Sequence, residues 1–158
     1  MKAIQKGFSL IELLIVVAII LIIAAIAIPN LLRSRIAANQ ASAVGSCRTI
    51  NTALITYAST FNTGYSPTML ALGPGANPPT AAQAGLIDSV LAAGNKSGYT
   101  FAYTAGSAVG GRINTYTLTA NPQTVGTTGT NFYFTDETGV IRQSSTTTAS
   151  AASSPVGG

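Results

Sequence analysis

The sequence predicts an α+β protein in which a long N-terminal α-helix packs, through its C-terminal half, on a small antiparallel β-sheet. Three observations support this fold class. Residues 8–28 are almost entirely apolar, apolar residues recur every three or four positions over residues 44–61, and from residue 98 the period changes to two. At 158 residues the chain has room for one domain of moderate size.

The apolar run is long enough to cross a membrane. It covers residues 8–28, where Ser9 and Glu12 are the only residues that are not apolar. A helix of this length spans roughly 32 Å, which matches the hydrocarbon core of a bilayer. A carboxylate in such a helix costs about 3 kcal/mol by insertion scales, so we expect Glu12 to have a partner. The run itself contains no basic residue that could serve.

A short basic segment precedes the run. Residues 1–7 carry Lys2 and Lys6 and end at Gly7. An ordinary secretory signal is cleaved after its apolar region, whereas here the plausible cleavage site lies before it. The stretch KGFSLIELLIVVAIILIIAAIAIP resembles the N-terminus of type IV pilins and of the pseudopilins of type II secretion. The resemblance covers about the first fifth of the chain and combines the basic leader, Gly7-Phe8, Glu12 and Pro29 at the family's spacings.

The resemblance implies a processing step, an assembly contact and a lollipop-like fold. A prepilin peptidase would cleave between Gly7 and Phe8 and methylate the new Phe8 amine. Glu12 would neutralise a Phe8 amine, that of the neighbouring subunit in a filament. Electrostatics favours this pairing independently, because opposite charges attract strongly where the dielectric is low and each is costly alone. The helix dipole also favours a carboxylate near this end. The alternative is a generic signal-anchor helix with a stray glutamate.

Pro29 either ends the helix at the membrane boundary or kinks it. Helical periodicity resumes beyond it, which favours a kinked helix that continues to residue 61 and stops at residues 62–64. The predicted apolar stripe consists of Val44, Cys47, Ile50, Leu54, Tyr57 and Phe61. Arg48, Thr52 and Ser59 lie on the other side. We interpret Cys47 as a small buried hydrophobe rather than a reactive thiol. As the single cysteine, it excludes the intrachain disulfide that many pilins have.

Glycines and prolines interrupt residues 62–98, which are predicted to connect the helix to the sheet. Within this connection residues 80–93 could form a short helix, stopped by Gly94 and Asn95. Its inward-facing residues would be Leu86, Ile87, Val90 and Leu91. The sheet is predicted over residues 99–143 as an antiparallel meander with one aromatic face. Its expected strands include the alternating sets Tyr99/Phe101/Tyr103 and Tyr116/Leu118/Ala120, then residues 131–135 and 140–143. Residues 144–158 form a low-complexity segment that we expect to be a mobile tail.

Asp136 and Glu137 are weak candidates for a metal site, since some pseudopilins bind calcium in a C-terminal loop. Calcium takes six to eight oxygen ligands, and two adjacent acids fall short of that number. A four-residue turn that opens at Asp136 and closes at Gly139 is the preferred interpretation.

Composition argues against several function classes. The chain has no histidine, no cluster of metal ligands and no phosphate-binding glycine loop, so we predict neither an enzyme nor a cofactor. The net charge is +4 and becomes +2 once Lys2 and Lys6 leave with the leader. This charge is too small to indicate nucleic acid as an obligatory partner.

The predicted organisation is a leader (residues 1–7), a transmembrane or filament-core helix (8–29), its amphipathic continuation (30–61), a connection (62–98), a sheet (99–143) and a tail (144–158). The resemblance implies a structural subunit of a type IV pilus-like filament, serving adhesion, motility or DNA uptake. Its partners would be copies of itself, prepilin peptidase, an inner-membrane assembly platform and the lipid bilayer. It would lie in the inner membrane with the head exported, then in a surface pilus or periplasmic pseudopilus. The alternatives are a type II secretion pseudopilin and a membrane-anchored binding domain that never polymerises.

Overall fold

The computed structural model describes residues 7–75 and 77–157. Lys2 and Lys6, the predicted leader charges, lie outside the described residues. The chain divides into two compact units, residues 1–35 and residues 36–158. One helix, α1 (Leu10–Phe61), supplies most of the first unit and the first element of the second.

In the first unit α1 begins after Ser9 and continues through Pro29. The predicted continuation beyond this proline is therefore confirmed. Proline has no backbone N–H, so Pro29 gives up a single hydrogen bond to the carbonyl group four residues earlier. The remaining backbone groups are paired within the helix, which is what an apolar environment requires of a single segment.

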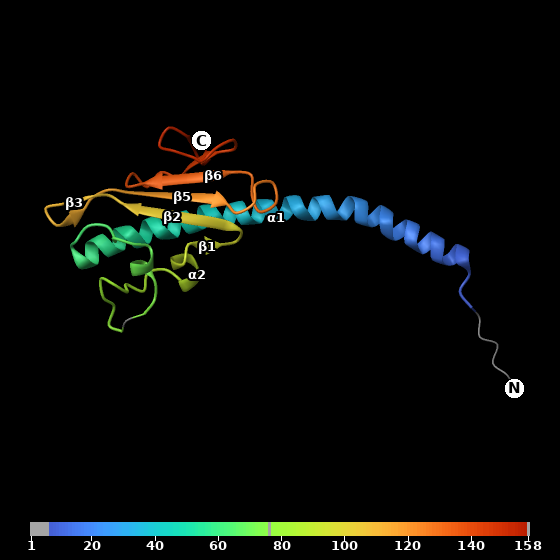
Figure 1. The fold of residues 1–158 in the computed structure, drawn as a ribbon, viewed down its shortest axis with the longest axis horizontal. Helices are drawn as coiled ribbons and strands as arrows, with labels where there is room; N and C mark the ends of the chain where they lie inside the picture. Colours follow the sequence, from blue (N-terminus) through green and yellow to red (C-terminus); the bar gives the residue numbers. More distant parts are fainter. Residues whose placement is uncertain (1–6, 76, 158) are drawn as a thin grey trace. The chain divides into compact units, whose positions relative to one another are not determined.

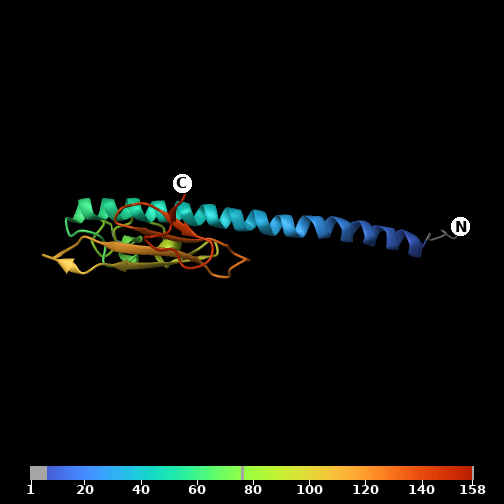
Figure 2. The ribbon, with the colours of Figure 1, turned by 90° about the horizontal axis from the view of Figure 1, so that it is seen from above.

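The second unit contains a six-stranded antiparallel sheet of spatial order β1-β2-β5-β6-β7-β8, which confirms the predicted meander. Its strands are β1 (Asn95–Lys96), β2 (Tyr99–Ala105), β5 (Tyr116–Pro122), β6 (Phe132–Asp136), β7 (Arg142–Ser144) and β8 (Ser154–Pro155). A separate hairpin pairs β3 (Ala108–Val109) with β4 (Arg112–Ile113). Figures 1 and 2 both show the C-terminal half of α1 lying along one face of the sheet.

Side-chain alternation places one face of the sheet against α1. In the pairing of β2 with β5, Phe101 stands opposite Ala120 and Tyr103 opposite Leu118, so these residues share a face. Phe101, Leu118 and Ala120 are buried, and Tyr103 is partly buried against the same core. The predicted aromatic face is therefore confirmed. The later strands each begin one or two residues further along than expected.

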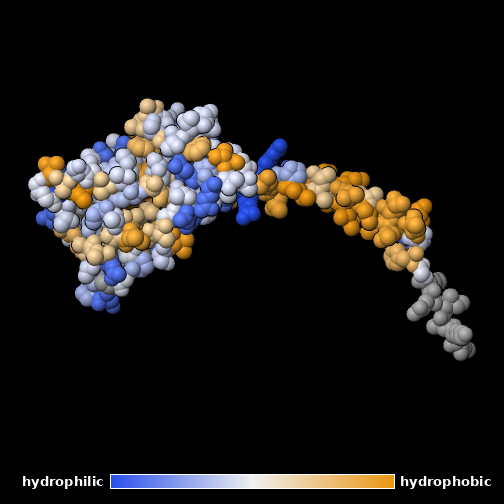
Figure 3. All heavy atoms as spheres, viewed as in Figure 1, coloured by the Kyte–Doolittle hydropathy of each residue, from blue (hydrophilic) through white to orange (hydrophobic). Residues whose placement is uncertain are grey.

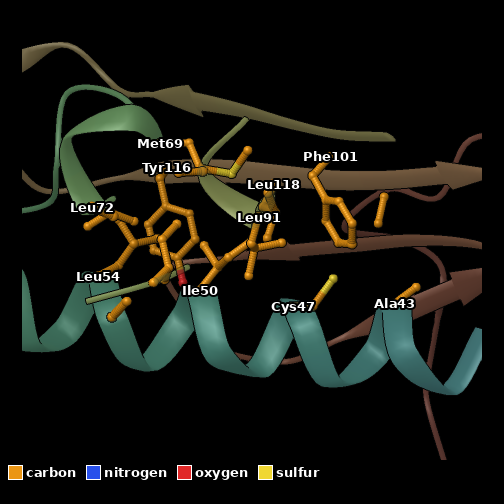
Figure 4. Packing of buried hydrophobic residues seen from close by; sticks show 14 of the residues in the cluster. Ala43, Cys47, Ile50, Leu54, Met69, Leu72, Leu91, Phe101, Tyr116 and Leu118 are labelled. Carbon is orange, nitrogen blue, oxygen red and sulfur yellow. The ribbon is translucent and has the colours of Figure 1, made fainter. Parts of the chain in front are cut away.

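The predicted helical stripe forms the other half of this core. Cys47, Ile50, Leu54 and Tyr57 are buried, and the stripe's end residues, Val44 and Phe61, are partly buried against them. Figure 4 shows helix side chains pointing toward the sheet residues. Burial raises the pKa of the Cys47 thiol to about 12, which keeps it protonated and unreactive. The interpretation of Cys47 as a buried hydrophobe is confirmed.

Asn51 adds a buried polar contact that the apolar pattern did not predict. Its Nδ2 donates to the Thr135 hydroxyl (2.9 Å) and to the Gly139 carbonyl (3.4 Å). Its Oδ1 accepts from the Tyr116 hydroxyl (3.0 Å). The side-chain amide therefore ties α1 to β5, β6 and the turn after β6, with both of its polar atoms satisfied.

The connection contains less helix than predicted. Only Ser89–Ala92 (α2) is helical in the expected stretch, and a 3₁₀ turn, η1 (Leu70–Leu72), precedes it. Before α2 the backbone instead bonds to the η1 region, where Ala84 N–H donates to the Ala71 carbonyl and Leu86 N–H to the Leu72 carbonyl. Tertiary hydrogen bonds thus replace the helical ones.

The ends of α2 follow from local chemistry. The Asp88 carboxylate accepts from the Leu91 N–H (2.8 Å) and caps the N-terminus. Gly94, with a φ of +82°, ends the helical conformation, as predicted. Ile87 and Leu91 are buried as expected, but the prediction for Val90 was wrong, because this side chain is 55% exposed. One turn of helix presents a single narrow face to the core, and Leu91 and Ala92 occupy it.

The prediction of a mobile C-terminal tail was wrong, and so were the sheet bounds, which omitted β1 and β8. β8 pairs with β7, and the Val156 N–H donates to the Ile141 carbonyl (2.8 Å). An Arg142 guanidinium N–H donates to the Ser153 carbonyl (3.1 Å), and Ala149 is only 3% exposed. Backbone pairing and small side chains hold this segment, neither of which produces an apolar period.

Candidate assembly site

The predicted cleavage site lies in exposed backbone just before α1. Gly7, Phe8 and Ser9 adopt no regular structure, and Phe8 is 82% exposed. A Cβ added at Gly7 would meet nothing within 4 Å. The chain's own fold therefore does not require glycine here, and any requirement comes from a partner that reads this position.

The Glu12 side chain caps the N-terminus of α1. The Leu13 N–H donates to the Ser9 carbonyl, which is the first helical bond, and the Ser9 N–H donates to Glu12 Oε2 at 2.9 Å. This is the reciprocal half of a capping box, in which a glutamate at the third helical position reaches back to the N-cap residue. The spacing Ser9-Leu10-Ile11-Glu12 is its sequence signal, which our sequence reasoning did not use.

The cap leaves part of the carboxylate available. Among the described residues Glu12 Oε1 has no hydrogen-bond donor, and no cation pairs with the group. In this chain the Phe8 nitrogen belongs to the peptide bond with Gly7, so the pairing of Glu12 with a free Phe8 amine stays a prediction.

The helix that follows leaves its large apolar side chains uncovered. Within the described part of the chain, α1 is the one helix long and apolar enough to cross a membrane, and none of its most apolar window is buried. Figure 3 shows hydrophobic residues covering the visible face of the helix in the first unit. The exposed residues are Leu10, Ile11, Leu13, Leu14, Ile15, Val16, Val17, Ile19, Ile20, Leu21, Ile22, Ile23, Ile26, Ile28, Leu31 and Leu32.

These exposed side chains make the surface of the first unit apolar. No described residue covers this apolar surface, and it exceeds what a monomer leaves to water. Gly7, Phe8 and Glu12 gather at the start of α1, whereas Pro29 lies 17 residues beyond Glu12, about 26 Å further along a helix. Pro29 therefore does not take part in the same local site.

The acidic pair of the second unit forms a turn. The Asp136 carboxylate accepts from the Thr138 N–H (3.0 Å), and the Gly139 N–H donates to the Asp136 carbonyl (2.9 Å). These bonds confirm the predicted turn. Among the described residues no group of three or more histidine, cysteine, aspartate or glutamate side chains could hold a metal ion. Asp136 and Glu137 thus acquire no further acidic ligand from the fold.

The N-terminal segment thus combines a helix able to span a membrane, an exposed Gly7-Phe8 bond before it and a glutamate that caps its start. Residues 2–28 match the family model of the prokaryotic N-terminal methylation motif. The type IV wide pilus major component PilA4 of Thermus thermophilus is 69% identical over 35 residues, 22% of this chain and 27% of that protein. The type IV major fimbrial protein FimA of Dichelobacter nodosus is 64% identical over 44 residues, 28% of each chain. No solved structure matches the chain.

The similarity confirms the resemblance to type IV pilins for the N-terminal segment. The matched stretches of 35 and 44 residues are both shorter than α1, which has 52. The chain spans about a quarter of the length of these curated relatives. The long helix packed on an antiparallel sheet is the pilin-like arrangement that the resemblance implied.

Proposed function

We propose that this chain is the structural subunit of a type IV pilus-like filament, processed by prepilin peptidase and polymerised from the inner membrane. The observation that carries the proposal is the division of apolar surface. The second unit buries a core of its own, whereas the first unit exposes nearly all of its large hydrophobic side chains. Lipid covers this surface before assembly, and the helices of other copies cover it afterwards.

Hydrophobic burial alone does not select the filament over the membrane. Lipid tails are as apolar as leucine, so transfer of α1 from lipid to a bundle of helices changes its apolar exposure little. The difference lies with Glu12, which is costly in hydrocarbon and needs a positive partner. The methylated amine of a neighbouring Phe8 supplies that charge, and Glu12 Oε1, which has no donor among the described residues, is the atom that accepts from it. The ion pair therefore selects the axial position of each incoming copy.

Processing must precede this pairing, because Phe8 has no amine until its bond to Gly7 is cut. We expect membrane-extracted and filament protein to begin at N-methylated Phe8, as intact-mass measurement would show. Gly7→Ala leaves the chain's own packing untouched, and a bulkier residue at this position should leave uncleaved precursor. Filaments that still carry residues 1–7, or cleavage after the apolar run, would contradict the proposal.

Assembly is tested at Glu12. Glu12→Gln and Glu12→Val should be inserted and cleaved but yield few filaments, because each leaves a buried amine unpaired, typically at a cost of several kcal/mol. Ile15→Val is the control, since it changes the same helix without touching charge. The measurement compares the membrane pool with sheared filaments by immunoblot. Normal filaments from both Glu12 variants would remove the pairing from the mechanism. Filaments confined to the periplasm would assign the chain to a pseudopilus instead.

A further inference from the structure

The side of α1 that faces away from the sheet in the second unit has an unusual polar surface. We call Gly45, Arg48, Thr49, Thr52, Thr56 and Ser59 the hydroxyl face. All six residues are exposed. Three of their hydroxyls donate to carbonyls of their own helix four residues earlier: Thr49 to Gly45 (3.1 Å), Thr56 to Thr52 (2.9 Å) and Ser59 to Ile55 (2.9 Å).

These internal bonds change what the face can contact. A hydroxyl that already donates within its helix keeps that bond when water leaves, so the usual cost of burying an unpaired polar group is small. Thr49, Thr56 and Ser59 have this donor bond already made within the helix. The face can therefore be covered by protein although its composition is polar.

Arg48 is the charged group on this face. Three other cations belong to the described part of the second unit, and each has a polar partner. Lys96 pairs with Asp88, Arg112 donates to the Asn62 side chain and Arg142 donates to a backbone carbonyl. Arg48 has no polar contact with any described residue, and it borders a shallow hollow of about 340 Å³ beside Thr52 and Leu86.

The complementary charge lies on the Asp136–Gly139 turn, whose Gly139 carbonyl accepts from Asn51 of α1. Asp88 is neutralised by Lys96 at 2.8 Å, which leaves Asp136 and Glu137 as the acids without an ion pair among the residues described there. Asp136 ends β6 and opens the turn, and Glu137 follows it, is exposed and makes no hydrogen bond to the described residues. One unpaired cation on a helix face is thus matched by an unpaired acidic turn.

We infer that the hydroxyl face around Arg48 docks a second copy of this chain through the copy's Asp136–Glu137 turn. The inference rests on the proposed filament function and names one of its contacts. The face and the turn are different patches, so the contact passes from copy to copy in one direction. Contacts of this heterologous kind build helical filaments when their rotation does not close a ring. The charge pair fixes which residues meet, and the back-bonded hydroxyls let them meet closely.

Charge reversal in the full-length protein tests the contact. Arg48→Glu and Glu137→Arg each bring like charges together, and each should lower the yield of sheared filaments about fivefold or more. Co-expression of the two variants should restore the yield, because each copy then finds its opposite charge on the other. Arg112→Glu makes the same change in net charge elsewhere and should assemble like the wild type.

The outcomes separate the contact from its alternatives. Restoration by both changes in one chain, but not by co-expression, would place the pair within a copy and overturn the inference. Unimpaired single variants, or an equal loss with Arg112→Glu, would overturn it as well. In these cases wild-type filaments leave the proposed function intact, whereas a wild type that forms none would overturn both.

Discussion

The two halves of α1 are parts of one helix with opposite relations to their surroundings. Residues 10–35 expose apolar side chains around the helix, whereas residues 36–61 bury one stripe and expose hydroxyls on the other side. Both halves satisfy the backbone in the same way, so backbone hydrogen bonding does not distinguish them. In the second half, packing on the sheet stabilises the helix. In the first, an apolar environment outside the chain has to do so.

The polar residues of the two halves show the same contrast. Asn51 is buried and satisfied by three groups of its own chain. Within the described part of the chain, Glu12 has one backbone N–H as a donor and a second carboxylate oxygen without one. A buried polar group must be paired wherever it lies. The second half therefore has the partners that its buried amide needs, whereas Glu12 in the first half needs a partner from outside the helix.

The largest expected effect comes from removing the first half. A protein that begins at about Arg33 should be a soluble monomer with a cooperative thermal transition, because the core of the second unit is intact without the apolar helix. Circular dichroism and thermal melting check this. Cys47 should resist thiol reagents until unfolding, as expected of a buried thiol with a raised pKa. Full-length protein in detergent is the control, and a truncated protein without helix signal would contradict the docking of α1.

A second effect separates the halves by a matched pair of leucines. Leu54 is fully buried against the sheet, whereas Leu21 is 63% exposed in the apolar half. Leu54→Ala should lower the free energy of unfolding of the second unit by about 2–5 kcal/mol through lost burial and a cavity. Leu21→Ala should leave that quantity unchanged. Denaturation of the full-length chain in detergent, followed by tyrosine fluorescence, measures both, and equal losses would mean that the units do not unfold independently.

These contrasts also show which parts of the fold the sequence predicts. The stripe through Cys47 and Leu54 and the alternation of β2 and β5 were correctly predicted, because apolar periodicity records burial directly. Asn51 was missed because an apolar pattern does not register a buried amide. The tail was misjudged because Ser154 and Pro155 pair with β7 through the backbone, and backbone pairing leaves no apolar period in the sequence. Tertiary hydrogen bonds also displaced the helix predicted before Ser89.

The candidate site divides in a similar way. The resemblance identified Gly7, Phe8 and Glu12, and the comparisons match that segment. The cap between Ser9 and Glu12 was readable from spacing alone, as a serine three residues before a glutamate. That Arg48 lacks a polar partner could not be predicted from the sequence, because it depends on which partners the fold gives to the other cations of the second unit.

A third, smaller effect is expected at Asn51. Asn51→Ala removes the amide and leaves the Thr135 and Tyr116 hydroxyls to find other partners, which should cost about 1–3 kcal/mol. Thr52→Ala, on the exposed side of the same turn, should change stability by less than about 0.5 kcal/mol. Chemical denaturation of the truncated protein compares the two. Equal values would show that the amide is replaceable by water.

The smallest effect concerns an ion pair that water reaches. The Lys96 ammonium and the Leu91 N–H hold the pKa of Asp88 below its ordinary value of 3.8. A lowered folded-state pKa contributes stability that is complete above the unfolded value and is lost as pH falls through the folded value. Asp88→Asn keeps an N-cap acceptor but removes the charge. At neutral pH it should cost only a few tenths of a kcal/mol, because solvent reaches both side chains and screens the pair.

Repeating the denaturation at a pH below the lowered folded-state pKa of Asp88 should bring wild type and Asp88→Asn together, since the folded wild-type carboxylate is then uncharged. All other side chains are common to both proteins, so their contributions cancel from the difference. A gap that persists in acid would assign the effect to the cap rather than to the charge. The Asp88–Lys96 pair and the pair proposed for Glu12 differ in their access to solvent. A pair in water contributes tenths of a kcal/mol, whereas the pair proposed for Glu12, away from water, leaves several kcal/mol at stake when one partner is removed.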